Sequence, residues 1–240
     1  MRLLITRPTE DAAPLVRALE ECGHEAIVEA LMTIHDVAAP DLNRDLDGAQ
    51  ALLITSANGI RAFARAHSGR LIPVCAVGDA SARVARELGF HQVHSAGGDV
   101  ETLAAMVEKK FKPSGGALVH IAGTHLAGDL GGKLTQAGFE VRRVVLYEAR
   151  ASNAIGPKTT AALKSGSLDG VLLFSPRTAE LFYRLVTDAG LEEHCRQLTA
   201  CCLSAAVAEK ASALAWASVV VASTPDQQAL LKAIETPHQQ

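Results

Sequence analysis

The residues of this chain best suited to chemistry are hydroxyl side chains at points where a predicted strand is followed by a predicted helix. The stretch LITSANGIRAF at residues 53–63 has this form, and it nearly recurs at residues 173–182 as LFSPRTAELF. Similar corners are Thr6-Arg7-Pro8, Gly78-Asp79-Ala80-Ser81, Gly123-Thr124 and Ser204-Ala205. In open parallel sheets ligands bind beyond the carboxyl ends of the strands, where helix N-termini present unbonded N–H groups. Several such corners around one ligand would hold a compound with many carboxylates without a basic surface.

The candidate binding residues at these corners are Arg7, Ser56, Ser81, Thr124, Ser175 and Ser204. Arg7 lies just past the end of the first predicted strand and could pair with a carboxylate through its fork of N–H donors. The alternative for each hydroxyl is an ordinary N-cap that bonds only its own helix. Arg61 and Arg177 also follow strand ends, but they stand a turn into their helices. A solvated surface position is at least as good an interpretation for these two arginines.

Other catalytic motifs are missing from the sequence. Ser56 is not part of a G-x-S-x-G elbow, no glycine-rich phosphate loop follows the first strand, and neither CxxC nor HExxH occurs. The five cysteines are an odd number without metal-ligand spacing, which favours buried thiols in the cytoplasm over a disulfide framework. His91 and His94 are close in sequence, but no third ligand is evident, so we expect no metal site.

Composition restricts the function further. The 240 residues are 48% apolar and 20% charged, which is typical of a folded chain with one large or two small domains. A formal net charge of −3 argues against a general nucleic-acid binder. No apolar run approaches the roughly 18 residues of a membrane span, and the N-terminus MRLLITRP is predicted to be a strand rather than a signal peptide.

Strand and helix patterns alternate along the whole chain. The short β-prone runs are residues 3–5, 26–29, 51–55, 73–77, 117–121, 141–146, 170–174, 200–203 and 218–221. Between most of them lie segments with apolar residues at helical spacing, such as Ala12, Leu15, Val16 and Leu19. This alternation predicts an α/β fold with parallel sheets flanked by helices on both faces.

The sequence also contains an internal repeat that extends beyond the two matching corners at residues 53–63 and 173–182. Residues 17–25 match 132–140, residues 76–90 match 202–216, and residues 97–107 match 224–234, in the same order. We therefore predict two copies of a βα unit, roughly 1–112 and 115–240, that form sheets of similar topology. The alternative is chance similarity between any two stretches of an α/β protein.

These motifs together resemble the uroporphyrinogen-III synthase family. The resemblance rests on the ITRP start, the ITSANGIRAF and LFSPRTAELF corners, AVGDASARVARELGF at residues 76–90, the run from Gly123 to Val141, and VVLYE at residues 144–148. It implies two similar α/β domains joined by a two-stranded linker, with the active site in the cleft between them. The first would be discontinuous, residues 1–34 and 150–240, the second would be 38–146, and the linkers would be about 31–37 and 144–151.

The resemblance implies an enzyme of haem biosynthesis. It closes the linear tetrapyrrole hydroxymethylbilane, with loss of water and inversion of ring D, to uroporphyrinogen III. The pyrrole nitrogens supply the electrons, so neither a metal nor an organic cofactor is expected. We expect a cytoplasmic monomer that binds this small molecule and neither nucleic acid nor membrane, with a possible transient contact to the preceding pathway enzyme.

Two positions need comment in light of this resemblance. The family usually has a glycine followed by hydroxyl residues where this chain reads Ser204-Ala205-Ala206-Val207, which puts side-chain contacts there in doubt. The family also places a tyrosine at the position of Tyr147, one of two tyrosines in the chain. A phenol stays protonated at neutral pH and could donate to the departing hydroxyl, so Tyr147 is the catalytic candidate. Its alternative role is packing in the linker.

Two functions from other classes remain open at this point. One is a non-catalytic, two-lobed cytosolic binding protein for a polycarboxylate ligand. The other is a scaffold that associates with other tetrapyrrole enzymes. Only the enzyme would produce the asymmetric type III ring from hydroxymethylbilane, because spontaneous closure gives the type I isomer.

Overall fold

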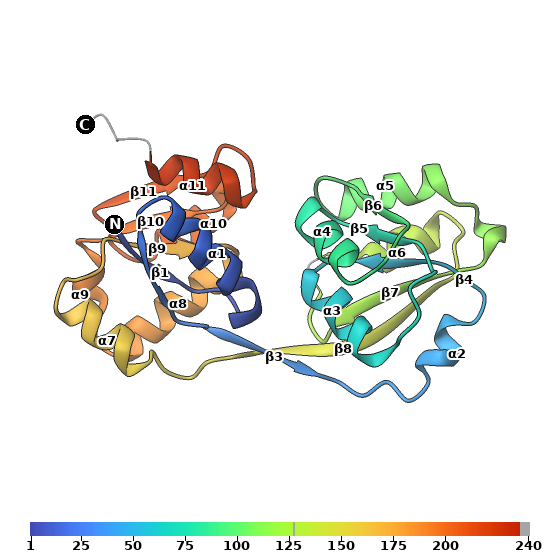
Figure 1. Cartoon of the computed structure of the whole chain (residues 1–240), viewed down its shortest axis with the longest axis horizontal. Coiled ribbons are helices and arrows are strands. Elements are labelled where there is room, and N and C mark those ends of the chain that lie inside the picture. Colours follow the sequence, from blue (N-terminus) through green and yellow to red (C-terminus); the bar gives the residue numbers. More distant parts are fainter. Residues whose placement is uncertain (127, 236–240) are drawn as a thin grey trace. The chain divides into compact units, whose positions relative to one another are not determined.

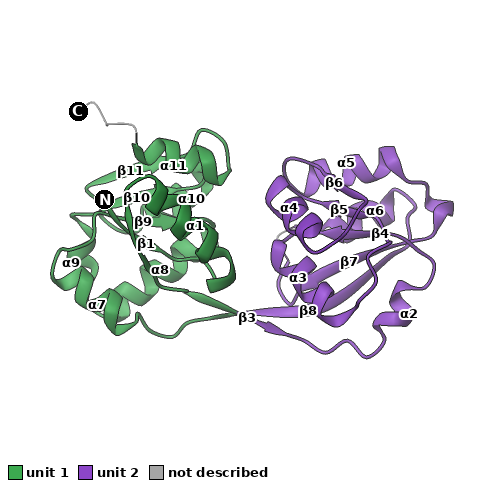
Figure 2. Cartoon of the chain, in the orientation of Figure 1, with its two compact units in different colours: residues 1–33, 150–240 green, residues 34–149 purple. Residues whose placement is uncertain are grey.

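The computed structural model describes residues 1–126 and 128–235 of the chain. The chain divides into two compact units, one made of Met1–Thr33 with the chain from Arg150 onward, and the other of Ile34–Ala149 (Figure 1, Figure 2). Unit 1 is thus discontinuous in sequence, and unit 2 is a single stretch. In the described part of the chain no helix has the length and apolar character needed to span a membrane.

Unit 1 contains a parallel sheet of five strands in the order β11-β10-β9-β1-β2. The strands are β1 (Arg2–Ile5), β2 (Glu25–Val28), β9 (Gly170–Leu173), β10 (Thr199–Cys202) and β11 (Ser218–Val221). Its helices are α1 (Thr9–Glu21), α7 (Pro157–Lys164), α8 (Pro176–Asp188), α9 (Glu192–Cys195), α10 (Ala205–Ala211) and α11 (Gln227–Glu235). Leu3 and Ile5 pack in one core with residues of α1 and α11, whereas Leu4 packs in a second core with α7, α8 and α10. Helices therefore cover both faces, because successive side chains of a strand point to opposite sides.

Unit 2 is built in the same way around a sheet in the order β3-β8-β7-β4-β5-β6. Its strands are β3 (Met32–Asp36), β4 (Ala49–Ile54), β5 (Val74–Ala76), β6 (Val93–Ser95), β7 (Ala117–Gly123) and β8 (Val141–Ala151). Its helices are α2 (Leu42–Leu46), α3 (Ala57–Ala66), α4 (Asp79–Glu87), α5 (Val100–Lys110) and α6 (Leu130–Gln136), with a short 3₁₀ turn, η1 (Pro113–Gly115). Residues of α2, α3 and α4 share a core with one face of the sheet, and residues of α5 and α6 share a core with the other.

The strands β3 and β8 pair with each other and form the expected two-stranded connection. The N–H of Val37 donates to Leu146 O at 2.8 Å, and the N–H of Ser152 donates to Leu31 O at 2.8 Å. Residue numbers rise along one strand and fall along the other, from Leu31 with Ser152 to Val37 with Leu146, so the pair is antiparallel. The boundary between the units falls within each strand, after Thr33 in β3 and after Ala149 in β8.

Five strands of each sheet have the same topology, and unit 2 adds β3 at one edge, but each sheet combines parts of the two sequence repeats. Apart from β3, the strands of the first repeat are β1, β2, β4, β5 and β6, and those of the second are β7, β8, β9, β10 and β11. Unit 1 joins β2 and β1 to β9, β10 and β11, whereas unit 2 joins β8 and β7 to β4, β5 and β6. The prediction of similar sheets is confirmed. The repeat by itself did not indicate that each sheet takes two strands from one repeat and three from the other, but the discontinuous first domain implied by the family resemblance did.

The predicted strands are present with boundaries shifted by a few residues. The sequence pattern did not predict β3 or β6, and β3 falls where the family resemblance implied a linker. Several helix ends follow local sequence signals. Gly23 and Gly138 follow the C-caps of α1 and α6 with φ values of 75° and 89°, a conformation that glycine adopts without steric penalty. Asp99 caps α5 in a capping box with Thr102.

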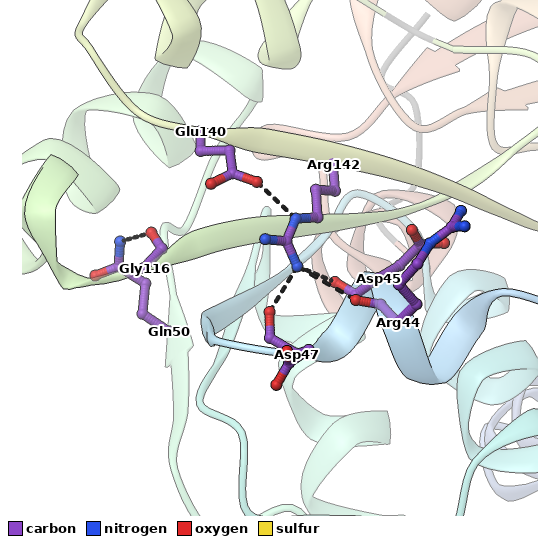
Figure 3. A network of polar contacts seen from close by, with 7 residues as sticks. All are labelled: Arg44, Asp45, Asp47, Gln50, Gly116, Glu140 and Arg142. Carbon is purple, nitrogen blue, oxygen red and sulfur yellow. Dashed lines mark hydrogen bonds and ion pairs between the residues drawn. The ribbon is translucent and has the colours of Figure 1, made fainter.

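A polar network in unit 2 fixes the short helix α2 to the sheet (Figure 3). The guanidinium of Arg142 donates to the backbone oxygens of Asp45 at 3.0 Å and Asp47 at 2.6 Å, and it pairs with Glu140 at 2.7 Å. These carbonyls lie at the C-terminal end of α2, where the helix leaves its own acceptors unbonded. Arg142 on β8 thus holds this helix end and is itself held by Glu140.

Candidate functional site

The candidate site in unit 2 lies at the carboxyl ends of β4 and β7, which are adjacent in the sheet. From β4 the chain continues through α3 to β5 on one face, and from β7 it continues through α6 to β8 on the other. The connections thus diverge between these two strands, the point at which open α/β sheets bind ligands. Thr55 and Ser56 follow β4, and Thr124 follows β7. The structure therefore brings together two of the predicted binding residues, Ser56 and Thr124.

Ser56 and Ser175 occupy equivalent positions in the two units. Each follows the central strand of its sheet, β4 or β9, and each is the N-cap of the next helix. The Oγ of Ser56 accepts from Asn58 N at 3.2 Å, and the Oγ of Ser175 accepts from Thr178 N at 3.1 Å. The predicted equivalence is confirmed. The capping role, considered above as the alternative to ligand binding, is present in both serines.

Tyr147 lies at the same end of the sheet, where a bulge in β8 determines which face its ring occupies. Ala122 pairs with Val145, but the next residue, Gly123, pairs with Tyr147, so Leu146 is an extra residue in β8. Side chains of a strand alternate between the two faces of the sheet, and an extra residue moves every following side chain to the opposite face. The Tyr147 ring consequently lies against Gly123, and it also approaches Gly59 in α3.

The hydroxyl of Tyr147 lies near Ser56, close enough for the serine to influence its ionisation. Burial raises the pKa of Tyr147, and the neighbouring Ser56 partly opposes this effect because it favours the ionised form. The group is a neutral phenol at physiological pH and can donate one proton. The backbone of Thr124 is held at the same place, since its N–H donates to Tyr147 O at 3.1 Å. Ser56, Thr124 and Tyr147 thus form one connected group.

In unit 1, Arg7 lies at the equivalent divergence point, between β1 and β9. Its guanidinium lies over the Phe174 ring, 4.4 Å from the ring centre, donates to Gln227 Oε1 at 3.3 Å and faces Asp11 at 3.9 Å. These contacts fix the side chain at the carboxyl edge of the sheet. Ser175 follows β9 at the same edge, so Arg7 and Ser175 belong to one candidate subsite.

Ser81 and Ser204 lie at the neighbouring corners, after β5 and β10, but neither side chain caps its helix. Gly78 is the N-cap of α4, and Ser81 is a buried residue in the first turn. Ser204 is the N-cap of α10 without a side-chain capping bond. Any ligand contact at these corners therefore falls to backbone N–H groups rather than to Ser81 Oγ. Arg61 donates to Asn58 in its own helix at 3.3 Å.

The sequence pattern did not single out His120, a buried polar residue of β7. Its Nε2 lies 3.3 Å from Thr55 Oγ1, which precedes the Ser56 corner. Burial, and secondarily the charge of Arg143, lowers the pKa of His120 to about 4, so the imidazole is neutral. A histidine inside an apolar strand (ALVHIAG) could have signalled this position, because buried polar side chains require a partner.

The cysteines and histidines form no metal centre in the described residues. No group of three or more His, Cys, Asp or Glu side chains there could hold a metal ion. All five cysteines are free thiols, and burial raises the pKa of Cys75 and Cys202 to about 11 and of Cys195 and Cys201 to about 12. These four thiols are therefore packing residues.

The comparison of the chain with known proteins agrees with this architecture. The fold is that of a two-unit α/β protein, with a candidate ligand site at the carboxyl edge of each sheet, where the connections diverge. Residues 13–232 match the family model described as uroporphyrinogen-III synthase HemD. The chain belongs to the uroporphyrinogen-III synthase family. A comparison with curated protein sequences gives no significant match.

Two solved structures illustrate the likeness of fold. The uroporphyrinogen-III synthetase from Helicobacter pylori 26695 aligns with a TM-score of 0.65 and 16% identity over 97% of each chain. A mutant uroporphyrinogen III synthase from the extremely thermophilic bacterium Thermus thermophilus aligns with a TM-score of 0.58 and 15% identity over 98% of this chain and 97% of that one. At these identities the likeness concerns the fold alone. The family match supports cyclisation of hydroxymethylbilane to uroporphyrinogen III in haem biosynthesis, and it does not favour the non-catalytic binding protein.

Proposed function

We propose that this chain closes hydroxymethylbilane by binding its carboxylates at the carboxyl edges of both sheets, while Tyr147 assists the loss of water. The observation that carries this proposal is the place of the Tyr147 ring, which lies against Gly123 and near Ser56 at the divergence point of unit 2. It puts the catalytic candidate next to a binding candidate at the place where this class of sheet binds ligands.

Carboxylate binding would use corners that are equivalent in the two units. In unit 1 these are Arg7 after β1, Ser175 after β9 and Ser204 after β10. In unit 2 they are Thr124 after β7, Ser56 after β4 and Ser81 after β5. The helices α3, α4 and α8 begin at three of these corners and present first-turn N–H groups to an anion. Each helix end contributes about 0.3–1 kcal/mol, and more where it is partly buried.

The chemistry begins when the hydroxyl leaves the hydroxymethyl group of the first ring and the C–O bond breaks. A pyrrole nitrogen supplies the electron pair, which gives an azafulvene and releases water. The substituted carbon of ring D attacks the azafulvene, and the resulting spiro intermediate fragments and recloses with ring D inverted. The chain positions the ends of the bilane for this attack, and such positioning supplies much of the acceleration.

Tyr147 would act at the first step. Hydroxide is a poor leaving group unless a proton or a hydrogen bond reaches the departing oxygen. The Tyr147 phenol can donate, and the nearby Ser56, which favours the ionised form, would support the charge that develops on the phenolic oxygen. No metal is required for this step, because the donor is a side chain.

The test is conversion of freshly prepared hydroxymethylbilane, with separation of the product isomers. The enzyme gives the type III isomer, whereas type I product alone would refute the proposal. A common cleft lined by both edges, the monomeric state, the cytoplasmic location and a transient contact with the preceding enzyme stay predictions.

A further inference from the structure

Arg143 lies beside the divergence point of unit 2 and is not one of the six candidate binding residues. It is an exposed residue of β8, next along the chain from Arg142. Its Nη2 donates to Gly123 O at 2.9 Å and to Thr124 O at 3.2 Å. These two carbonyls lie at the end of β7, so the guanidinium is held at the carboxyl edge of the sheet. Gly123, one of the two acceptors, is also the residue against which the Tyr147 ring packs.

The positive charge of Arg143 is not neutralised by these contacts. Both acceptors are neutral carbonyls, and within the described parts of unit 2 no carboxylate lies within 4.0 Å of its nitrogens. His120, whose pKa is lowered by burial and then by the charge of Arg143, is neutral and adds no charge beside Arg143. A guanidinium that is fixed, exposed and unpaired retains N–H donors for an external carboxylate.

The two arginines of β8 face opposite sides of the sheet. Arg142 pairs with Val119 in register and reaches α2, whereas Arg143 pairs with His120. Val119 belongs to the core shared with α3, and Leu118 belongs to the core shared with α5 and α6, so His120 and Arg143 face the α5 side. The bulge turns Tyr147 to the α3 side. The divergence point therefore has a proton donor on one face and a cation on the other.

We propose that Arg143 binds a carboxylate of the tetrapyrrole and is a substrate-binding residue for this reaction. The inference rests on the proposed function, since it names a further residue of the same site. It also supplies for unit 2 what Arg7 supplies for unit 1, a guanidinium fixed at the carboxyl edge beside the divergence point. The cation comes from β8 because the residue that follows Gly123 is Thr124 rather than an arginine.

The test compares Arg143→Gln with Arg142→Gln in steady-state kinetics on hydroxymethylbilane. Loss of one charge-assisted hydrogen bond should raise the KM of Arg143→Gln by about 10-fold or more, with kcat within about 3-fold of wild type. The wild-type KM should rise with added KCl, and the Arg143→Gln variant should show a shallower rise because one ionic contact is gone. Arg142→Gln should keep the wild-type KM and its salt dependence while its melting temperature falls.

A role of Arg143 in holding only the Gly123 and Thr124 carbonyls would give a different result. The melting temperature would fall, and both KM and its salt dependence would match Arg142→Gln, which would overturn the proposal. If Arg143→Gln does not fold, Arg143→Lys keeps the charge but not the fork, and it should retain the salt dependence with a smaller rise in KM. An unchanged KM in a folded Arg143→Lys with wild-type activity counts against carboxylate binding by this fork. Type I product from the wild-type chain would instead refute the proposed function itself.

Discussion

The ring of Tyr147 occupies the space that Gly123 leaves empty. A Cβ atom placed on Gly123 would lie 2.8 Å from Tyr147 Cζ and 2.9 Å from Cε2. The two residues are paired across β7 and β8 directly after the bulge. The position of the phenol therefore depends on a glycine in the neighbouring strand and on an extra residue in its own strand.

Replacing Tyr147 by phenylalanine tests its chemical role. The Tyr147→Phe ring can fill the same space, so we expect nearly the same melting temperature as wild type. Turnover should fall by up to ~10²-fold, the low end for loss of a general acid. Steady-state rates with hydroxymethylbilane and thermal melts of both proteins provide the measurement. Equal turnover would leave Tyr147 as a packing residue.

Gly123→Ala tests the dependence of the phenol on its neighbour. The added methyl group requires the Tyr147 ring to move, so we expect a loss of about 1–3 kcal/mol in the free energy of unfolding and reduced turnover. The matched control is Gly131→Ala in α6, where the added Cβ meets nothing within 4 Å. Alanine favours a helix interior by up to ~1 kcal/mol, so the control should be as stable as wild type or more so. Equal stability of the two variants in denaturant titrations contradicts the packing described here.

The double variant Arg7→Ala, Ser175→Ala tests carboxylate binding in unit 1. Affinity for the product uroporphyrinogen III should fall at least ~10-fold, chiefly through loss of the guanidinium. Ser175→Ala alone should change affinity little but should lower stability by about 1 kcal/mol, since the N-cap of α8 is lost. Anaerobic calorimetric titration measures the affinity. Unchanged affinity of the double variant removes the main support for the unit 1 subsite.

His120 should make stability depend on pH. Its pKa is about 4 in the folded chain, below the ordinary value of 6.5. The unfolded chain therefore binds the proton more readily, and His120 contributes stability above pH 6.5 that is lost as pH falls toward 4. The loss amounts to about 3 kcal/mol at most.

The control for this prediction is His120→Gln, whose amide can still bond Thr55 but does not titrate. Denaturant unfolding at several pH values should show a shallower fall for the variant than for wild type. Equal pH dependence in the two proteins would mean that other groups cause the acid destabilisation.

The alternating strands, the repeat and the equivalence of Ser56 and Ser175 could be predicted from the sequence, because these features are local. Each corner has its own apolar run, hydroxyl and helix pattern, and Gly23 and Gly138 mark helix ends in the same way. The exchange of strands between repeats was not visible in the local patterns, because β1 pairs with β9 more than 160 residues away, for example Leu3 with Gly170, and only the family resemblance implied it. Local patterns carry no information on such pairings.

The site was predictable only in part for the same reason. Ser81 carries a hydroxyl at the right spacing, but burial of its side chain follows from packing of α4. The pattern VRRVVLYE indicates only a surface position for Arg143. Its proposed role depends on contacts with the carbonyls at the end of β7, which belong to another strand. The bulge at Leu146 depends on the register between β7 and β8, which no single stretch of sequence fixes.

The most direct test of the central claim is the isomer composition of the product from hydroxymethylbilane. The wild-type chain should convert the bilane to the type III isomer faster than spontaneous closure, and heat-denatured protein should leave only the type I isomer. A non-catalytic binding protein would slow formation of type I without producing type III. Type III product with wild-type protein is the result that this account predicts, and type I product alone would contradict it.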